Sequence, residues 1–168
     1  MEFYTIFLIA FLSLVIVVNN WKKSVSANYL AISILCLSSF YFIILYTFNS
    51  NNAFILAIVF NHFGVISTLA GPFLFFFVRG VLTNRFKIKN YDYLFFIPTL
   101  LVFIDNLPYY TASFDYKIAL AQKIINNKIV LKEVSLNLFS TAVTSITFRV
   151  FYILACTVWS YTVIALQF

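Results

Sequence analysis

The stretch from Asn61 to Pro98, NHFGVISTLAGPFLFFFVRGVLTNRFKIKNYDYLFFIP, decides the fold class of this chain. It joins two apolar runs through a short basic loop, and the first run holds the only histidine, His62, and the pair Gly71-Pro72. Long apolar runs separated by short charged loops are typical of helices that cross a bilayer. The sequence therefore predicts an all-α protein, a polytopic bundle of transmembrane helices.

The composition of the whole chain agrees with a membrane protein. Its 168 residues are 63% hydrophobic and 10% charged, whereas soluble chains are about 45–50% apolar and about 25% charged. The net charge of +6 does not indicate direct DNA binding, because the cations lie between apolar runs, where they set orientation and attract anionic lipid headgroups. Cys36 and Cys156 lie in separate apolar runs and do not form a metal-binding pattern.

A helix that crosses a bilayer needs about 20 mainly apolar residues. About five spans are expected, at 3–21, 27–48, 54–82, 93–108 and 140–166, with a hydrophilic external section at 109–137 that contains one short interfacial helix. The first span lacks the positive region and the cleavage site of a signal peptide and is interpreted as a retained helix. The chain is predicted to be one membrane domain, truncated at its C-terminus.

The third span is longer than a perpendicular helix requires, so it must tilt, kink or project beyond the bilayer. Pro72 offers no N–H to the carbonyl of Thr68, and Gly71 adds backbone freedom. A helix kink is therefore predicted at Gly71 and Pro72. Arg79, seven residues later, is expected to extend its side chain to the membrane interface.

The basic residues of the short loops predict the orientation of the chain. The loops after the first and third spans carry cations, and the loop between the second and third spans carries none. By the positive-inside rule both basic loops are cytoplasmic and the N-terminus is outside. The topology determinants are Lys22, Lys23, Arg79, Arg85, Lys87 and Lys89.

The supply of reactive side chains argues against an enzyme, a metal site or a cofactor, since the chain has one histidine, five carboxylates and no catalytic motif. His62, Asp105 and Arg149 are expected at a similar depth in the outer half of three spans, where each is costly unless it is paired or faces a cavity. Two interpretations stay open. One is a ligand-binding cluster that opens to the outside, and the other is a structural Asp105–Arg149 pair with His62 at the interface.

Several segments resemble the N-terminal multi-helix membrane region of Bacteroidetes-type membrane-bound AraC-family helix-turn-helix transcription regulators. A GPLLYFYVRS-like segment of that family is matched at Gly71, Pro72 and Arg79, and a DLLHFIPF-like segment is matched at Tyr93, Leu94, Phe96, Ile97 and Pro98. Phe95 stands where the family commonly has His. A third segment is similar at Leu107-Pro108-Tyr109-Tyr110 and Lys117, and the first cytoplasmic turn is similar at Lys22-Lys23 and Asn28-Tyr29-Leu30-Ala31.

The resemblance implies a region of about seven helices followed by a cytoplasmic DNA-binding domain that this chain lacks. It implies a multi-pass sensor or anchor in the bacterial inner membrane that passes an outside or membrane signal to transcription. DNA would be contacted only through the missing domain, the ligand is unidentified, and a homodimer is an open option. The alternative is a small integral membrane scaffold or a transporter component, since a helix interrupted by Gly and Pro can mark a substrate site.

Overall fold

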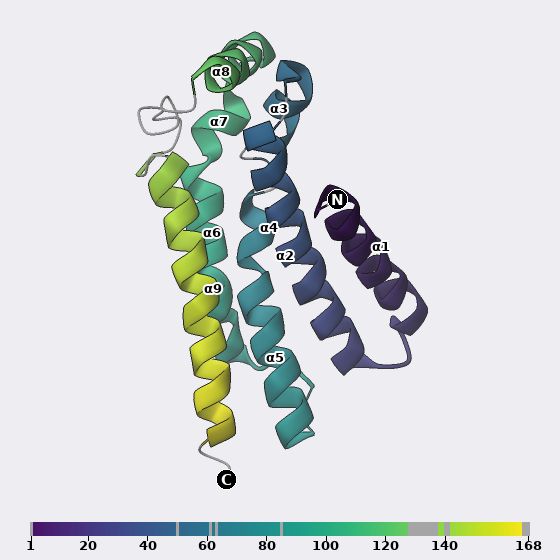
Figure 1. Ribbon diagram of the computed structural model, residues 1–168. Helices are drawn as coiled ribbons and strands as arrows, with labels where there is room; N and C mark the ends of the chain where they lie inside the picture. Colours follow the sequence, from purple (N-terminus) through teal and green to yellow (C-terminus); the bar gives the residue numbers. More distant parts are fainter. Residues whose placement is uncertain are drawn as a thin grey trace.

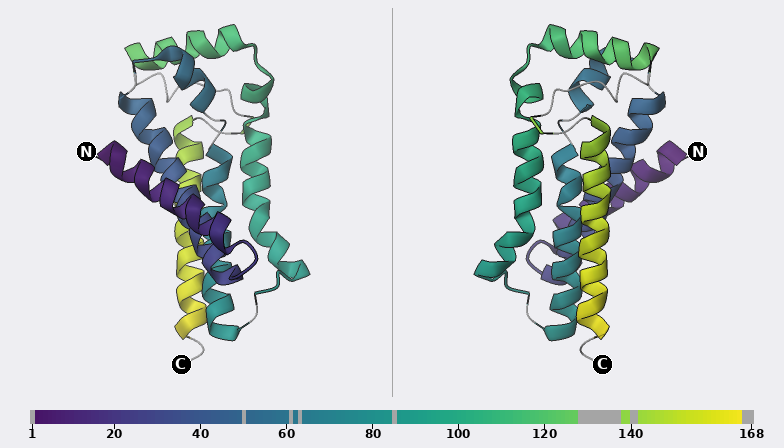
Figure 2. Two further views of the ribbon diagram at one scale, coloured as in Figure 1. Left: turned by 90° about the vertical axis from the view of Figure 1, so that its right-hand side faces the viewer. Right: turned by 90° about the vertical axis from the view of Figure 1, so that its left-hand side faces the viewer.

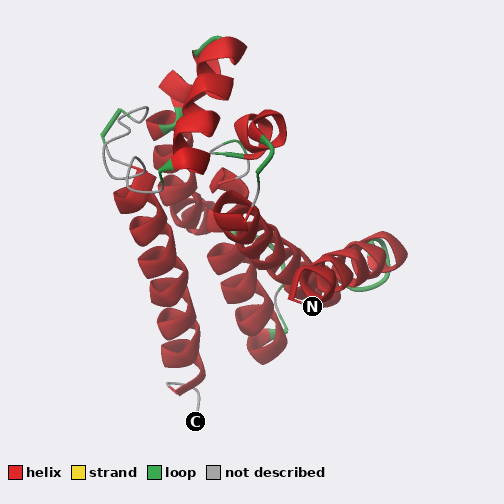
Figure 3. Ribbon diagram, turned by 45° about the horizontal axis from the view of Figure 1, so that its top comes forward, coloured by secondary structure: helices red, strands yellow, loops and turns green. Residues whose placement is uncertain are grey.

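A computed structural model describes residues 2–49, 51–60, 62, 64–84, 86–127, 138–139 and 142–165. These residues form helices and loops and contain no strand, which confirms the predicted all-α class (Figure 3). The elements are α1 (Glu2–Asn20), α2 (Val25–Asn49), α3 (Ala53–Val59), α4 (Gly64–Thr68), α5 (Ala70–Thr83), the 3-10 helix η1 (Asn90–Phe96), α6 (Ile97–Asp105), α7 (Leu107–Thr111), α8 (Phe114–Asn126) and α9 (Ala142–Ala165).

The long helices form a bundle with two distinct ends (Figure 1). Helix α2 packs against α1 on one side and against α4 and α5 on the other, and α5 packs against α9. At the upper end in Figure 1, helix α8 lies across the bundle and packs on α3, an arrangement that Figure 2 shows from both sides. We call this end, with α3, α7 and α8, the cap end. The opposite end, with the α1–α2 turn and the α5–η1 loop, is the basic end.

Local signals explain where the helices of the cap end begin. Helix α3 starts after Asn52, whose side-chain oxygen accepts hydrogen bonds from the backbone N–H groups of the next turn at 3.1 and 3.2 Å. Helix α8 starts after Ser113, which caps it in the same way, and α7 begins with Pro108 in its first turn. The short helix expected within the hydrophilic section is α8, while its position at a membrane interface stays a prediction. Residues 128–137 of that section lie outside the described residues.

The third predicted span, 54–82, is divided into three helices. Helix α3 belongs to the cap end, where it packs on α8, and only α4 and α5 continue along the bundle. The break between α4 and α5 lies at Leu69, whose N–H donates to the carbonyl of Ile66 at 3.1 Å. It comes three residues before Pro72, whose ring nitrogen has no proton for the preceding turn. The Ser33 hydroxyl of α2 donates to the Ala70 carbonyl at 2.8 Å.

Gly71 has a different role from the one its sequence context suggested. Backbone freedom was expected to help the kink, but no glycine in the described residues has a positive φ angle. A Cβ at Gly71 would instead lie 2.9 Å from both Cβ and Sγ of Cys156 on α9. Gly71 is therefore required for the close approach of α5 and α9, as small residues are at many helix crossings in membranes.

The sides of the bundle are apolar, and a cluster of buried apolar side chains lies at the cap end. Two helical stretches in the described residues are long and apolar enough to cross a bilayer, Val25–Tyr46 and Val65–Thr83, and the apolar stretch Tyr4–Asn20 is shorter. The number of five spans stays a prediction. Large apolar side chains are exposed along the outer helices, for example Phe7 at 61% on α1 and Phe151 at 66% on α9. The core at the cap end consists of Leu56, Ala57, Phe60, Tyr109, Leu120, Ala121 and Ile124.

Candidate functional site

Polar side chains from five parts of the chain gather at the cap end, close to the apolar core there. They come from the α3–α4 link and from helices α6, α7, α8 and α9. We call this group the cap cluster. It comprises His62, Asp105, Tyr109, Tyr110, Lys117 and Arg149.

Tyr109 is the fixed centre of the cap cluster. Its side chain is fully buried, and its hydroxyl donates to the Ala57 carbonyl of α3 at 2.8 Å. The His62 ring meets the Tyr109 ring edge to face, with ring centroids 5.2 Å apart, and lies 5.4 Å from the Tyr110 ring. His62 therefore contacts both tyrosines of α7, and aromatic contact fixes its position.

Lys117 approaches Tyr109 from helix α8. This lysine is only 8% exposed, and its ammonium group donates to the Tyr110 carbonyl at 3.1 Å. The same group lies 5.3 Å from the centroid of the Tyr109 ring, within the range of a cation–π interaction. Among the described residues no carboxylate lies within salt-bridge distance of Lys117. A carbonyl and an aromatic ring therefore hold this cation.

Asp105 and Arg149 form the other half of the cluster. Both are buried, at 7% and 3% exposure, and Arg149 interacts electrostatically with Tyr110 and Asp105. One carboxylate oxygen of Asp105 accepts a hydrogen bond from the Phe139 N–H at 2.7 Å, and the Asp105 carbonyl accepts one from the Leu138 N–H at 2.9 Å. Asp105 therefore holds the backbone of Leu138 and Phe139 and also balances part of the Arg149 charge.

The three residues singled out from the sequence, His62, Asp105 and Arg149, thus belong to one continuous group, and Tyr110 links the first to the last. Whether the group binds a ligand stays a prediction. Lys117 appeared in the sequence only as part of a family motif. The spacing of residues in α8 could have placed it in the cluster. Lys117 is followed at i+3, i+4 and i+7 by Leu120, Ala121 and Ile124, so all four residues share the buried face of the helix.

The electrostatics of the cap cluster favour a neutral imidazole. Burial lowers the pKa of His62, and the nearby Lys117 charge lowers it further, while the backbone groups of Phe60 and Ile58 raise it. Burial also raises the pKa of the Tyr110 hydroxyl. The cluster therefore holds two cations and one carboxylate beside neutral rings.

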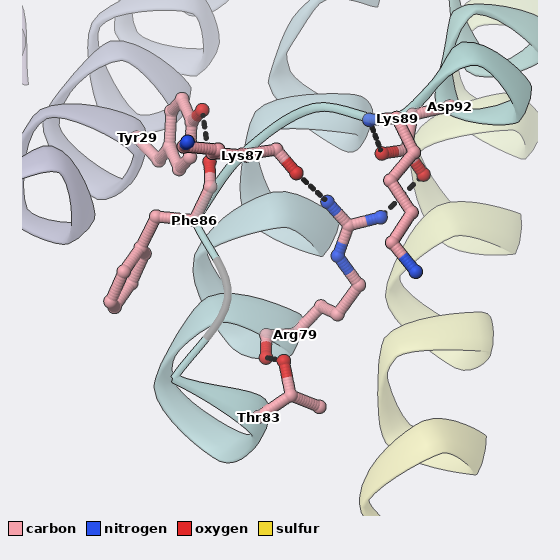
Figure 4. Close-up of polar contacts among 7 residues, drawn as sticks. All are labelled: Tyr29, Arg79, Thr83, Phe86, Lys87, Lys89 and Asp92. Atoms are coloured by element: carbon pink, nitrogen blue, oxygen red, sulfur yellow. Dashed lines mark hydrogen bonds and ion pairs between the residues drawn. The ribbon is translucent and has the colours of Figure 1, made fainter.

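A second polar group lies at the basic end, where Arg79 and Asp92 form a salt bridge (Figure 4). Asp92 is fully buried, and it also accepts a hydrogen bond from the Lys89 N–H at 2.6 Å. Arg79 lies over the rings of Phe75 and Phe76, at 5.6 and 5.4 Å from their centroids. The guanidinium group of Arg79 is thus bound within the protein. The sequence had suggested that it extends to the membrane interface, but the α5–η1 loop brings Asp92 within salt-bridge distance.

The rest of the α5–η1 loop folds against the bundle in the same way. The Tyr29 hydroxyl of α2 donates to the Phe86 carbonyl at 2.9 Å (Figure 4). The Phe86 ring covers Gly80, where a Cβ would overlap it. Lys22, Lys23, Lys87 and Lys89 are exposed at this end of the bundle, and Arg85 lies outside the described residues.

A cavity of about 240 Å³ lies beside the bundle between the N-terminal half of α1 and the C-terminal half of α2. Its lining is apolar apart from Ser38 and Ser39, and both hydroxyls donate to carbonyls of their own helix at 2.8 Å. The cavity offers room but no charged group to recognise a polar ligand. The cap cluster is therefore the stronger candidate for specific recognition.

No set of three or more His, Cys, Asp or Glu side chains that could hold a metal ion occurs in the part of the chain that the structure describes. Comparison of the chain with protein-family models, with curated proteins and with solved structures gave no match.

Proposed function

We propose that this chain is the membrane-embedded input region of a one-component transcription regulator. In this role it receives a signal at or outside the membrane and passes it to a cytoplasmic DNA-binding domain that lies beyond these residues. The link to transcription depends on the resemblance of the Gly71-Pro72, Tyr93–Pro98 and Leu107–Tyr110 segments to AraC-type regulators. The observation that carries the sensor role is a buried polar cluster at one end of an apolar bundle whose other end is basic.

The distribution of surface character supports the membrane location. Many of the exposed large apolar side chains lie on α1 and α9. The α1–α2 turn and the α5–η1 loop, both of which carry lysines, lie at the basic end of the bundle (Figure 1). A bilayer explains both features, because lipid covers the apolar sides and the cytoplasmic face retains the cations. The five spans of this proposal are α1, α2, α4 with α5, η1 with α6, and α9. Their alternation places the N-terminus and the cap end outside.

The cap cluster supports the sensor role because two of its residues lie on or next to helices that run from the cap end to the basic end. His62 lies two residues before the start of α4, which leads into α5. Arg149 lies on α9, which packs against α5 through Gly71 and Cys156. A ligand that changed the contacts of either residue would act on the crossing of these helices. Signalling further requires that this crossing has two arrangements with different affinities for the ligand.

Two experiments test the proposed function. A reporter protein fused after Asn90 is expected to be cytoplasmic, and one fused after Asn127 is expected to be outside; the reverse pattern would refute the orientation. The coding sequence that follows Phe168 is expected to contain two further apolar runs and then a basic helix-turn-helix region. A stop codon directly after Phe168 would refute the regulator.

The second candidate function is a transporter component or a membrane scaffold. It is favoured by the helix break at Leu69, since interrupted helices line the substrate sites of many transporters. The two candidates differ in what Arg149→Ala changes in the intact protein. A regulator loses the response of its target promoter while uptake of solutes is unchanged, whereas a transporter shows the opposite result.

A further inference from the structure

Lys117 is a buried cation on the inward face of helix α8. It shares the inward face of the helix with Leu120, Ala121 and Ile124, which belong to the apolar core of the cap end. The lysine is 8% exposed, whereas Lys123 on the same helix is exposed. Burial of an ammonium group is costly unless an anion or several hydrogen-bond acceptors compensate it.

The compensation that the described residues provide is incomplete. An ammonium group has three N–H donors, and one of them reaches the Tyr110 carbonyl at 3.1 Å. The Tyr109 ring stabilises the charge from its face at 5.3 Å. No carboxylate among the described residues lies within salt-bridge distance. The Lys117 charge also acts on the His62 ring, where it disfavours a second positive charge.

The charge balance of the whole cap cluster is positive as well. Arg149 and Lys117 contribute two cations, and Asp105 contributes the single carboxylate, one oxygen of which already accepts the Phe139 N–H. Asp105 interacts electrostatically with Arg149, which leaves the Lys117 side of the cluster without a negative charge among the described residues. An additional negative group would therefore be stabilised most strongly next to Lys117.

We propose that the cap cluster binds an oxyanion, a carboxylate or phosphate group, and that the Lys117 ammonium is its principal ligand. The proposal rests on the proposed function, since this anion would be the signal that the input region receives. Charge-assisted N–H donors bind oxyanions at about 2.7–2.9 Å and roughly twice as strongly as neutral donors do. The adjacent His62 ring adds a neutral group that can donate or accept one hydrogen bond.

The anion can come from two sources with the same chemistry. One is a small carboxylate or phosphate solute, and the other is the phosphate of an anionic lipid headgroup. Helix α8 lies across the end of the bundle (Figure 2), the place where lipid headgroups meet the protein in the proposed orientation. A cation is excluded as the ligand on electrostatic grounds, because it would meet the Lys117 charge.

The test uses the full chain purified in an uncharged detergent. Its thermal unfolding is measured in sodium phosphate, sodium acetate and sodium chloride at equal ionic strength, and then in nanodiscs of phosphatidylglycerol or phosphatidylcholine. We expect at least one of phosphate, acetate or phosphatidylglycerol to raise the unfolding midpoint above its reference. A response to the salts identifies a solute, and a response to phosphatidylglycerol alone identifies a headgroup.

Two variants on α8 show whether Lys117 is responsible. Lys117→Met should weaken the apparent affinity for the responsive anion about tenfold or more, the effect of one charge-assisted hydrogen bond. Lys123→Met, on the same helix but exposed, should leave the affinity unchanged. The proposal is overturned if none of the three anions stabilises the unmodified chain, or if Lys117→Met keeps the full response.

A measurement on the unmodified chain covers the case in which Lys117→Met does not fold. Acetylation of individual lysines by acetic anhydride is followed by mass spectrometry with and without sodium phosphate at constant ionic strength. The responsive anion should slow the modification of Lys117 and leave that of Lys123 unchanged, and equal rates at Lys117 would again overturn the proposal. A negative result here leaves the sensor role intact with another ligand class, whereas a failed topology or downstream-sequence test removes the sensor role and leaves the anion site.

Discussion

Replacement of Arg79 by methionine should strongly destabilise the protein, because it leaves the Asp92 carboxylate buried without its cation. Asp92 is fully buried, and its described hydrogen bonds are to the Arg79 guanidinium group and the Lys89 N–H. Breaking a buried ion pair by removing one partner costs about 3–5 kcal/mol. Loss of the contacts with the rings of Phe75 and Phe76 adds about 0.5–1 kcal/mol.

The free energy of unfolding can be measured in mixed micelles by tryptophan fluorescence, for Arg79→Met, Asp92→Asn and the double variant. The double variant should be less destabilised than the sum of the single variants by about 1–3 kcal/mol, since the two side chains interact directly. Lys87→Met is the matched control, because this lysine is exposed in the same loop, and it should lie within about 0.5 kcal/mol of the unmodified chain.

A small effect of Arg79→Met on the free energy of unfolding would contradict this reasoning. If Arg79→Met changes the free energy of unfolding by no more than Lys87→Met does, the guanidinium group contacts headgroups or solvent. Additive effects of Arg79→Met and Asp92→Asn would lead to the same conclusion. Either result would mean that the Arg79–Asp92 ion pair does not hold the α5–η1 loop in its folded-back conformation.

Three further predictions concern the crossing of α5 and α9 and the cap end. Gly71→Leu should destabilise the protein by about 1–3 kcal/mol in the same assay, because its Cβ would overlap Cys156, and Cys156→Ala should recover part of the loss. Tyr109→Phe should cost about 1–3 kcal/mol, since it leaves a buried carbonyl of α3 without its donor. The pKa of His62 is lowered by burial and by Lys117, so the unfolded chain binds the proton more readily. The contribution of His62 to stability should be present above its unfolded pKa of about 6.5 and be lost as the pH falls through the folded value, and His62→Gln should abolish this part of the acid sensitivity measured by thermal unfolding.

The positions of the three longest described helices could be predicted from local hydrophobicity. The predicted spans 3–21, 27–48 and 140–166 lie within a few residues of α1, α2 and α9, because a continuous apolar run has few alternatives to a helix in an apolar environment. The third span could not be predicted in detail. Its first part, α3, is as apolar as the rest, and only the packing of α3 on α8 separates it from the bundle.

The candidate site was predictable only in part. The cost of ionisable groups in apolar runs pointed to His62, Asp105 and Arg149, which lie in one cluster through Tyr110. Lys117 was missed because it lies in the hydrophilic section, where a lysine needs no explanation. Its burial follows from the inward rotation of α8, which depends on the partner helix and not on the residue itself.

The sequence by itself determined the helical class and the approximate helix positions, because hydrophobicity and helix propensity act within a few residues. It also indicated that the lysines of the two basic loops lie on the same side of the bundle. The tertiary structure alone decided which groups meet. Arg79 pairs with a carboxylate 13 residues away, and the Tyr29 hydroxyl bonds to a carbonyl 57 residues away. Such contacts depend on how whole helices pack, a property of the complete chain that no local pattern contains.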